Sequence, residues 1–285
     1  FVVDSFAQFN MVIILISSLA CFTLAYGYIE GYGDNKEELY LLLLISTLGA
    51  LFMVCADNLA SFFVSLELLS VPLYGMLAYT YARGKSLEAG FKYLILSATA
   101  SATMLMGMAL IYSNTGTLSF RQIGMAIVPM FQNGIVMPIL VVGTALMLFG
   151  IAFKLSAVPF HTWTPDVYQG APAPVATFLG SVSKVAMMAL GLRFLLSTAT
   201  LALPAINTLI VVIASLSMII GNVLALRQHN IKRLLAYSSI AHIGYVLAII
   251  SAVKVESAGF VSLYMAVYAF TTIGAFGVVT IMSSP

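Results

Sequence analysis

The sequence predicts an all-α polytopic membrane protein with about nine transmembrane helices, one of them broken. Hydrophobic residues make up 61% of the 285 residues and charged residues 8%, against about 25% charged residues in an ordinary soluble domain. About nine apolar runs, each near the twenty residues that cross ~30 Å of hydrocarbon, account for almost the whole chain. The lipid bilayer is therefore the expected environment, and the net charge of +2 does not indicate a nucleic-acid partner.

The first half of the chain predicts four spans and a long connection. The spans are expected at residues 5–26, 39–56, 59–82 and 86–112. Only Asp57 and Asn58 separate the second span from the third, so these two helices are expected to be antiparallel neighbours. Residues 113–137 form the connection, and the apolar periodicity of 117–127 predicts a short helix at the membrane surface.

The fifth span begins near Pro138 and carries Lys154. Pro159 and Pro165 follow, and proline cannot continue a regular helix, so we predict that this helix is broken. Broken helices are tolerated where the freed backbone groups line a cavity, and in transporters they mark the site.

Four more spans complete the predicted bundle. They are expected at residues 174–196, 204–226, 234–250 and 258–282. Lys184 lies roughly 15 Å past the start of the sixth span, close to the middle of the bilayer. The chain starts without Met and stops directly after the last span, so we expect it to be part of a longer protein.

Basic residues gather in alternate loops. One side collects Lys36, Arg83, Lys85, Arg227, Lys232 and Arg233, and the other has Arg121, Arg193 and Lys254. The positive-inside rule then places the N-terminus outside and the 83–86 and 227–233 loops in the cytoplasm.

Two tight turns containing asparagine, Asp57-Asn58 and His229-Asn230, lead from one span to the next, five spans apart. A repeat of five spans inverts its orientation in the membrane, as in many transporters. We therefore expect inverted five-helix repeats, with the first span and acidic loop at 1–38, a first repeat at 39–200 and a partial, truncated second repeat at 201–285.

Three ionisable residues inside spans are candidate proton-relay groups, namely Glu67, Lys154 and Lys184. Such groups are expensive in a membrane and are functional by default. Burial lowers the proton affinity of a lysine and a nearby carboxylate restores it, so moving that carboxylate would switch the lysine. We expect Glu67 and Lys154 to form an ion pair, and Lys184 to face the interior along a stripe with Thr177 and Ser181. The alternative is that these charges are structural.

His242 is a candidate extension of this relay, beside the hydroxyl groups of Tyr237, Ser238 and Ser239, or else a merely hydrogen-bonded histidine. Asp166 is expected to cap a helix and hold the loop around it in place. His161 and Trp163 are expected to anchor the broken helix near the interface. The sequence contains no glycine-rich phosphate loop, metal-ligand spacing or nucleophile elbow, so neither a metal nor chemistry on a bound substrate is indicated.

Four stretches carry a resemblance to a known family: LELLSVPLYGMLAY, FKLSAVPFHTWTPDVYQGAPAPV, SKVAMM and NIKRLLAYSSIAHIGY. They resemble the antiporter-like membrane subunits of respiratory complex I, the proton-translocating NADH:quinone oxidoreductase, over essentially the whole chain. In that family the matching positions, Glu67, Lys154 and Lys184, are the proton-path groups.

The resemblance implies a translocase subunit of a bacterial inner membrane, packed against other membrane subunits. It also implies that this chain does no redox chemistry, and that NADH, FMN, iron–sulfur clusters and quinone act in the rest of the complex. Two other interpretations stay open, a subunit of a multi-subunit sodium/proton antiporter and a structural spacer subunit without ion transfer.

Overall fold

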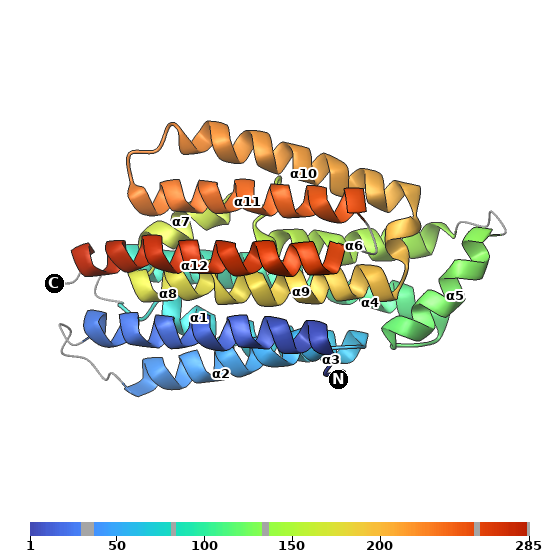
Figure 1. The fold of residues 1–285 in the computed structure, drawn as a ribbon, viewed down its shortest axis with the longest axis horizontal. Helices are drawn as coiled ribbons and strands as arrows, with labels where there is room; N and C mark the ends of the chain where they lie inside the picture. Colours follow the sequence, from blue (N-terminus) through green and yellow to red (C-terminus); the bar gives the residue numbers. More distant parts are fainter. Residues whose placement is uncertain (30–36, 81–83, 133–136, 254–256, 284–285) are drawn as a thin grey trace.

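The computed structural model describes residues 1–29, 37–80, 84–132, 137–253 and 257–283, and these form a bundle of long, roughly parallel helices (Figure 1). The helices are α1 (Ser5–Ile29), α2 (Glu37–Cys55), α3 (Leu59–Leu77), α4 (Gly84–Thr115), α5 (Phe120–Gln132), α6 (Pro138–Leu155), α7 (Trp163–Gly170), α8 (Ala173–Gly180), α9 (Val182–Ser197), α10 (Pro204–Ala225), α11 (Ile231–Val253) and α12 (Ser257–Ser283). A short 3₁₀ turn, Thr200–Ala202, joins α9 to α10.

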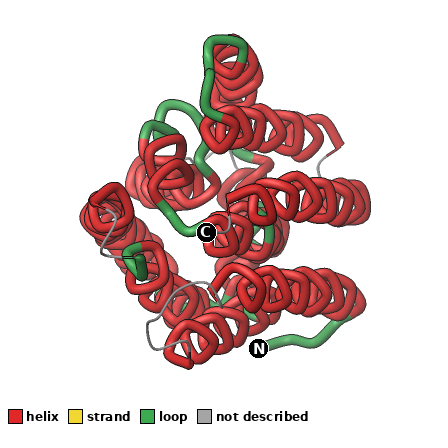
Figure 2. The backbone as a smooth tube through the Cα atoms, turned by 90° about the vertical axis from the view of Figure 1, so that its left-hand side faces the viewer, coloured by secondary structure: helices red, strands yellow, loops and turns green. Residues whose placement is uncertain are grey.

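Nine stretches within the described ranges are long and apolar enough to cross a membrane, with α8 and α9 counted as one. Their bounds agree with the predicted spans to within a few residues, and α5 confirms the short helix predicted in the long connection. Viewed along the bundle, red helical tubes fill the cross-section in Figure 2. The all-α polytopic fold is confirmed.

The two asparagine turns are built alike. The side chain of Asn58 accepts a hydrogen bond from the backbone N–H of Ser61 at 2.7 Å and caps α3. The side chain of Asn230 accepts from the N–H groups of Lys232 and Arg233 at 3.0 and 3.3 Å and caps α11. Each cap satisfies N–H groups that the first helical turn leaves unpaired. This likeness supports the predicted repeat, whose boundaries stay a prediction.

Each of the two helix pairs also crosses closely at a glycine. A Cβ atom at Gly49 in α2 would lie 2.4 Å from the backbone nitrogen of Leu69 in α3. A Cβ atom at Gly221 in α10 would lie 2.7 Å from the backbone nitrogen of Ala241 in α11. Only the hydrogen side chain of glycine lets the paired backbones approach this far.

The predicted broken helix is confirmed between α6 and α7. Lys154 is the residue before the last of α6, and Ser156 then adopts a left-handed conformation with φ of 65°. Pro159 cannot donate the hydrogen bond of a continuing helix, and α7 starts at Trp163. Pro165, expected to break the helix, lies instead in the first turn of α7, where its missing N–H costs nothing. As a result α7 is a separate helix of eight residues.

The sixth span, α8 with α9, lies in the centre of the bundle, and its most apolar stretch is entirely buried. The sequence predicts one continuous helix here, whereas the structure interrupts it at Ser181, with φ of −109° and ψ of −78°. The hydroxyl groups of Thr177 and Ser181 each donate to the carbonyl oxygen four residues earlier, at 2.8 and 2.7 Å. Such bonds compete with the helical ladder and bend helices.

The two ends of the bundle differ in charge. The described basic residues Lys85, Arg227, Lys232 and Arg233 lie at the end where α4 and α11 begin, and Arg121 and Arg193 lie at the end where α5 sits (Figure 1). This distribution agrees with the loop alternation in the sequence; Lys36, Arg83 and Lys254 fall outside the described residues. The orientation in the membrane stays a prediction.

Candidate functional site

Lys154 is buried between α3, α4 and α6, with 5% of its surface exposed. Its ammonium donates to the hydroxyl groups of Ser70 in α3 and Ser97 in α4, each at 2.7 Å. The ring centroid of Tyr93 lies 5.7 Å from Nζ, close enough for a cation–π contact. The groups that contact the ammonium are therefore neutral: two hydroxyl groups and an aromatic ring.

Glu67 does not pair directly with Lys154 in the structure, so the expected ion pair is wrong. The carboxylate of Glu67 accepts a hydrogen bond from Ser101 in α4 at 2.7 Å. Ser101 lies one helical turn beyond Ser97, the partner of Lys154. Glu67 also lines an apolar groove of about 500 Å³ beside α2 and α3. The two groups are thus connected through α4.

Lys184 faces the interior of the bundle, as predicted, with 1% of its surface exposed. Its ammonium donates to the hydroxyl group of Ser239 in α11, which also accepts a hydrogen bond from Tyr268 in α12 at 2.9 Å. Thr177 and Ser181, from the predicted polar stripe, are fully buried as well. The three helices α9, α11 and α12 therefore meet at this lysine.

A cavity of about 170 Å³ adjoins the Lys184 site between α11 and α12. Polar side chains on its wall are Ser238, Ser239, His242, Tyr268, Thr271 and Thr272. A space of this size with polar groups on its wall has room for several water molecules. His242 lines this cavity, and its Nδ1 lies 2.7 Å from the hydroxyl oxygen of Tyr264. The structure thus brings His242 together with Lys184, on one side of the bundle.

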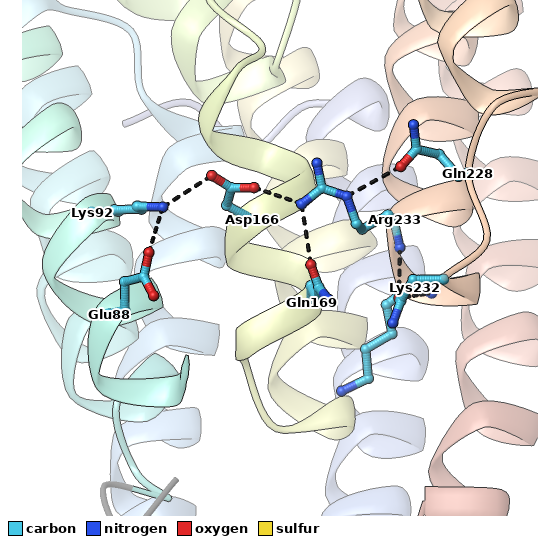
Figure 3. A network of polar contacts seen from close by, with 8 residues as sticks. Glu88, Lys92, Asp166, Gln169, Gln228, Lys232 and Arg233 are labelled. Carbon is cyan, nitrogen blue, oxygen red and sulfur yellow. Dashed lines mark hydrogen bonds and ion pairs between the residues drawn. The ribbon is translucent and has the colours of Figure 1, made fainter. Parts of the chain in front are cut away.

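The short helix α7 is held by an ionic cluster at the end of the bundle (Figure 3). Asp166 accepts from Lys92 in α4 at 3.0 Å and from Arg233 in α11 at 2.6 Å. Lys92 also pairs with Glu88 at 2.6 Å, and Arg233 donates to Gln169 at 3.1 Å. Asp166 is therefore not the cap of α7, which is Thr162, but it does hold this segment in place.

Burial alone would raise the pKa of Asp166, but the hydrogen bonds and positive charges of Arg233 and Lys92 outweigh burial. The pKa of this carboxyl group therefore lies below its ordinary value.

The interfacial role expected for Trp163 is wrong. Its side chain is 2% exposed and packs between Tyr93 and Phe153, at centroid distances of 5.0 and 5.4 Å. The indole N–H donates to the carbonyl oxygen of Phe153 at 3.1 Å. Since the helix break turns α7 back against α4, the indole enters the core.

Sequence reasoning missed most hydroxyl partners of the two lysines. The sequence nevertheless contains a signal for the polar groups around each of the two lysines. Tyr93, Ser97 and Ser101 recur every four residues along the fourth span, and Tyr264, Tyr268 and Thr272 do so along the ninth. Residues four apart share a helix face, so each set is a polar stripe in an apolar span.

Both lysine sites suit reversible protonation. Within the described residues no carboxylate lies within ion-pair distance of Lys154 or Lys184. A buried unpaired ammonium is costly, whereas a neutral amine is far less so, and hydroxyl groups can bond with either form. The arrangement can therefore take up and release protons without losing its hydrogen bonds.

Comparison with known proteins agrees with this geometry. Residues 56–285 match the family model described as NADH:quinone oxidoreductase/Mrp antiporter, TM. The chain is 63% identical to NADH-quinone oxidoreductase subunit N of Psychrobacter arcticus over all of its 285 residues, which cover 57% of that protein.

Two solved structures share the fold. A chain of respiratory complex I from Thermus thermophilus superposes with a TM-score of 0.81 and 34% identity, over 98% of this chain and 58% of that one. A chain of the Mrp complex from Dietzia sp. superposes with a TM-score of 0.82 at 23% identity, over 96% and 50% of the two chains, which shows the fold alone. The chain spans about half the length of the relatives it matches.

These bacterial relatives and the nine apolar stretches confirm a multi-pass protein of a bacterial inner membrane. The family model covers most of the chain, and the helix order, the broken helix and the relatives all agree with it. The chain therefore belongs to the NADH:quinone oxidoreductase/Mrp antiporter transmembrane family.

Proposed function

We propose that the chain is the larger part of the ion-translocating core of a membrane subunit of a bacterial NADH:quinone oxidoreductase, and that it moves protons. The observation that carries the proposal is the pair of buried lysines held by serine hydroxyl groups in place of carboxylates. A structural lysine at such depth is normally paired with a carboxylate. Lysines without such a pair are retained in membranes for ion pathways.

In this proposal Glu67, Lys154 and Lys184 are the relay groups, and His242 extends the relay through the cavity between α11 and α12. Ser97 and Ser101 supply the hydroxyl connection between Lys154 and Glu67. A small rotation of α4 would lengthen or shorten both bonds together. Proton transfer would then follow the position of α4.

The partners in this proposal are the other membrane subunits of the complex. NADH, FMN, the iron–sulfur clusters and quinone belong to those parts of the complex that perform electron transfer. The relatives named subunit N favour this assignment over the sodium/proton antiporter, although the family description covers both.

The test uses the full-length subunit in its complex, in inverted membrane vesicles. Lys154→Ala and Lys184→Ala should abolish NADH-driven proton uptake while the NADH–ferricyanide activity of the assembled complex is retained. Lys85→Ala, at an exposed lysine, is the matched control. Normal proton uptake in both variants would favour a structural spacer, and uptake of ²²Na⁺ driven by an imposed proton gradient would favour the antiporter.

A further inference from the structure

The short helix α7 contacts the surroundings of Lys154 through Trp163. The indole packs on Tyr93, whose ring faces the ammonium of Lys154 at 5.7 Å. It also donates to the carbonyl oxygen of Phe153, the residue directly before Lys154. Any displacement of α7 therefore changes the wall of the Lys154 site.

The same helix contacts the surroundings of Lys184 through Tyr168. This ring lies 5.7 Å from that of Phe276, which lines the cavity with Ser239, the hydrogen-bond partner of Lys184. The hydroxyl oxygen of Tyr168 lies 3.1 Å from the place that a Cβ atom would take at Gly180, one turn before Lys184. The hydroxyl group is buried. One short helix thus forms part of the wall at both lysines.

Between these two contacts, α7 is tied to the rest of the bundle by Asp166. Its two carboxylate oxygens accept from two different helices, Oδ2 from Lys92 in α4 and Oδ1 from Arg233 in α11 (Figure 3). The helix α4 belongs to the predicted first repeat and α11 to the second. Charge-assisted hydrogen bonds of this kind are the strong ones.

Arg233 is itself fixed in orientation. Its guanidinium group donates to Gln228 at 3.1 Å through Nε and to Gln169 at 3.1 Å through Nη1, in addition to Asp166. Gln169 is also in α7, so Arg233 donates to this helix at two residues, Asp166 and Gln169. A lysine has a single side-chain nitrogen, so it could not donate from two nitrogens held in this fixed geometry.

We propose that Asp166 is a positioning residue for proton transfer. Together with Lys92 and Arg233 it holds α7 at one place between the two repeats, and Trp163 and Tyr168 on α7 thereby set the shape of the Lys154 and Lys184 sites. Asp166 does not carry the proton itself. The inference rests on the proposed function, because it concerns the relay named there.

The experiment uses the full-length subunit in its complex, in membrane vesicles. Asp166→Asn removes the charge at almost unchanged size, Asp166→Glu retains the carboxylate, and Glu37→Gln removes an exposed carboxylate at the same end of the bundle as the control. The measured quantities are the rate of NADH-driven proton translocation per assembled complex, its solvent deuterium isotope effect, and hydrogen–deuterium exchange in residues 163–170.

Asp166→Asn is expected to lower the rate per complex by about tenfold or more, the scale on which small misplacements of reacting groups slow a transfer. The isotope effect should increase because proton transfer becomes rate-limiting, and the amides of α7 should exchange faster. Asp166→Glu should recover most of the rate, and Glu37→Gln should match the wild type. A purely structural role would lower the amount of assembled complex and leave the rate per complex and the isotope effect unchanged, which would overturn the proposal.

If Asp166→Asn prevents assembly, Lys92→Gln and Arg233→Gln each remove one of the two partners and leave the other pair intact. A wild-type rate per complex and isotope effect in both would likewise overturn the proposal. Lys184→Ala separates this inference from the proposed function. If that variant fails to pump while Asp166→Asn pumps normally, only the positioning role is wrong. If Lys184→Ala pumps normally, the proposed relay is wrong. In that case hydrogen–deuterium exchange still tests the second claim, because unchanged exchange in α7 of Asp166→Asn would show that Asp166 does not fix the position of this helix.

Discussion

Glu67 and Lys154 are linked through one turn of α4 and do not touch each other. Ser101 donates to the carboxylate at 2.7 Å, and Ser97, four residues earlier on the same helix, accepts from the ammonium at 2.7 Å. In the proposed relay, the switch expected from an ion pair would therefore depend on the position of α4. Hydroxyl groups can both donate and accept, so they can connect the two groups in either protonation state.

Removing the hydroxyl group of Ser97 should interrupt this link. We expect Ser97→Ala to slow proton translocation by roughly tenfold, because a hydrogen bond to a charged group contributes about 1.5–3 kcal/mol. Ser97→Thr keeps the hydroxyl group and should be partly tolerated. Proton uptake by vesicles measures both, with Ser113→Ala at an exposed position of the same helix as the control. Full activity of Ser97→Ala would contradict the link.

Ser239 accepts hydrogen bonds from Lys184 and Tyr268, and its removal should destabilise the protein more when the lysine is present. We expect Ser239→Ala to cost about 1–3 kcal/mol, the penalty for a buried polar group that loses its partner. In the Lys184→Met background the same change should cost less, since only the hydrogen bond from Tyr268 is then lost. Unfolding of the four variants in detergent completes the cycle. Equal losses in the two backgrounds would show that the bond contributes nothing.

The close crossings of α2 with α3 and of α10 with α11 predict a strong effect of one methyl group. Gly49→Ala and Gly221→Ala should each destabilise the protein by about 1–3 kcal/mol, since backbones must move apart to accommodate the Cβ atom. Gly274→Ala, where no atom lies within 4 Å of the added carbon, is the matched control and should be neutral or slightly stabilising. Thermal unfolding in detergent ranks the three, and equal melting temperatures would count against the crossings.

Asp4 and Arg193 predict a pH dependence at the opposite end of the bundle. Arg193 binds both carboxylate oxygens of Asp4, at 2.7 and 2.9 Å, and these hydrogen bonds lower the pKa of Asp4 from its ordinary value of 3.8. A depressed folded-state pKa adds stability that is fully present above the unfolded value and is lost as the pH falls through the folded value.

Asp4→Asn should therefore be less stable than the wild type at neutral pH, and the difference should shrink as the pH falls below about 4. Melting temperatures in detergent at neutral and at strongly acidic pH measure it. A difference that stayed constant down to pH 3 would show that the carboxylate charge plays no part.

The spans were predictable from the sequence because each must be apolar over the full width of the bilayer. The inward direction of Lys184 was predictable for a similar reason, since an ammonium cannot face lipid and Thr177 and Ser181 mark the same face. The break after Lys154 was predictable because Pro159 lacks the N–H group that a continuing helix needs, which is a local property, whereas Pro165 starts no break and lies in the first turn of α7.

The partners of the lysines could not be predicted in this way. Whether Lys154 meets Glu67 or Ser97 depends on the rotation of α3, α4 and α6 about their axes. For α4 and α6, close packing at Gly107, Gly143 and Gly150 constrains this rotation. Trp163 was misplaced for a related reason. A tryptophan side chain suits a membrane–water interface, but the turn at Ser156 directs α7 into the bundle. That direction depends on tertiary packing and cannot be predicted from the local sequence.

The complete burial of residues 173–195 has a consequence for biogenesis. These residues do not face lipid in the folded protein, so the segment can carry Lys184, and a lysine opposes insertion by about 2.5–3.5 kcal/mol at the centre of a helix. If this segment left the translocon without other helices, its insertion into the bilayer would be unfavourable. Its retention in the bilayer must depend on helices that surround it, among them α11 and α12, which are synthesised later. The lysine that the proposed relay requires thus makes the integration of the central helix depend on helices that are synthesised after it.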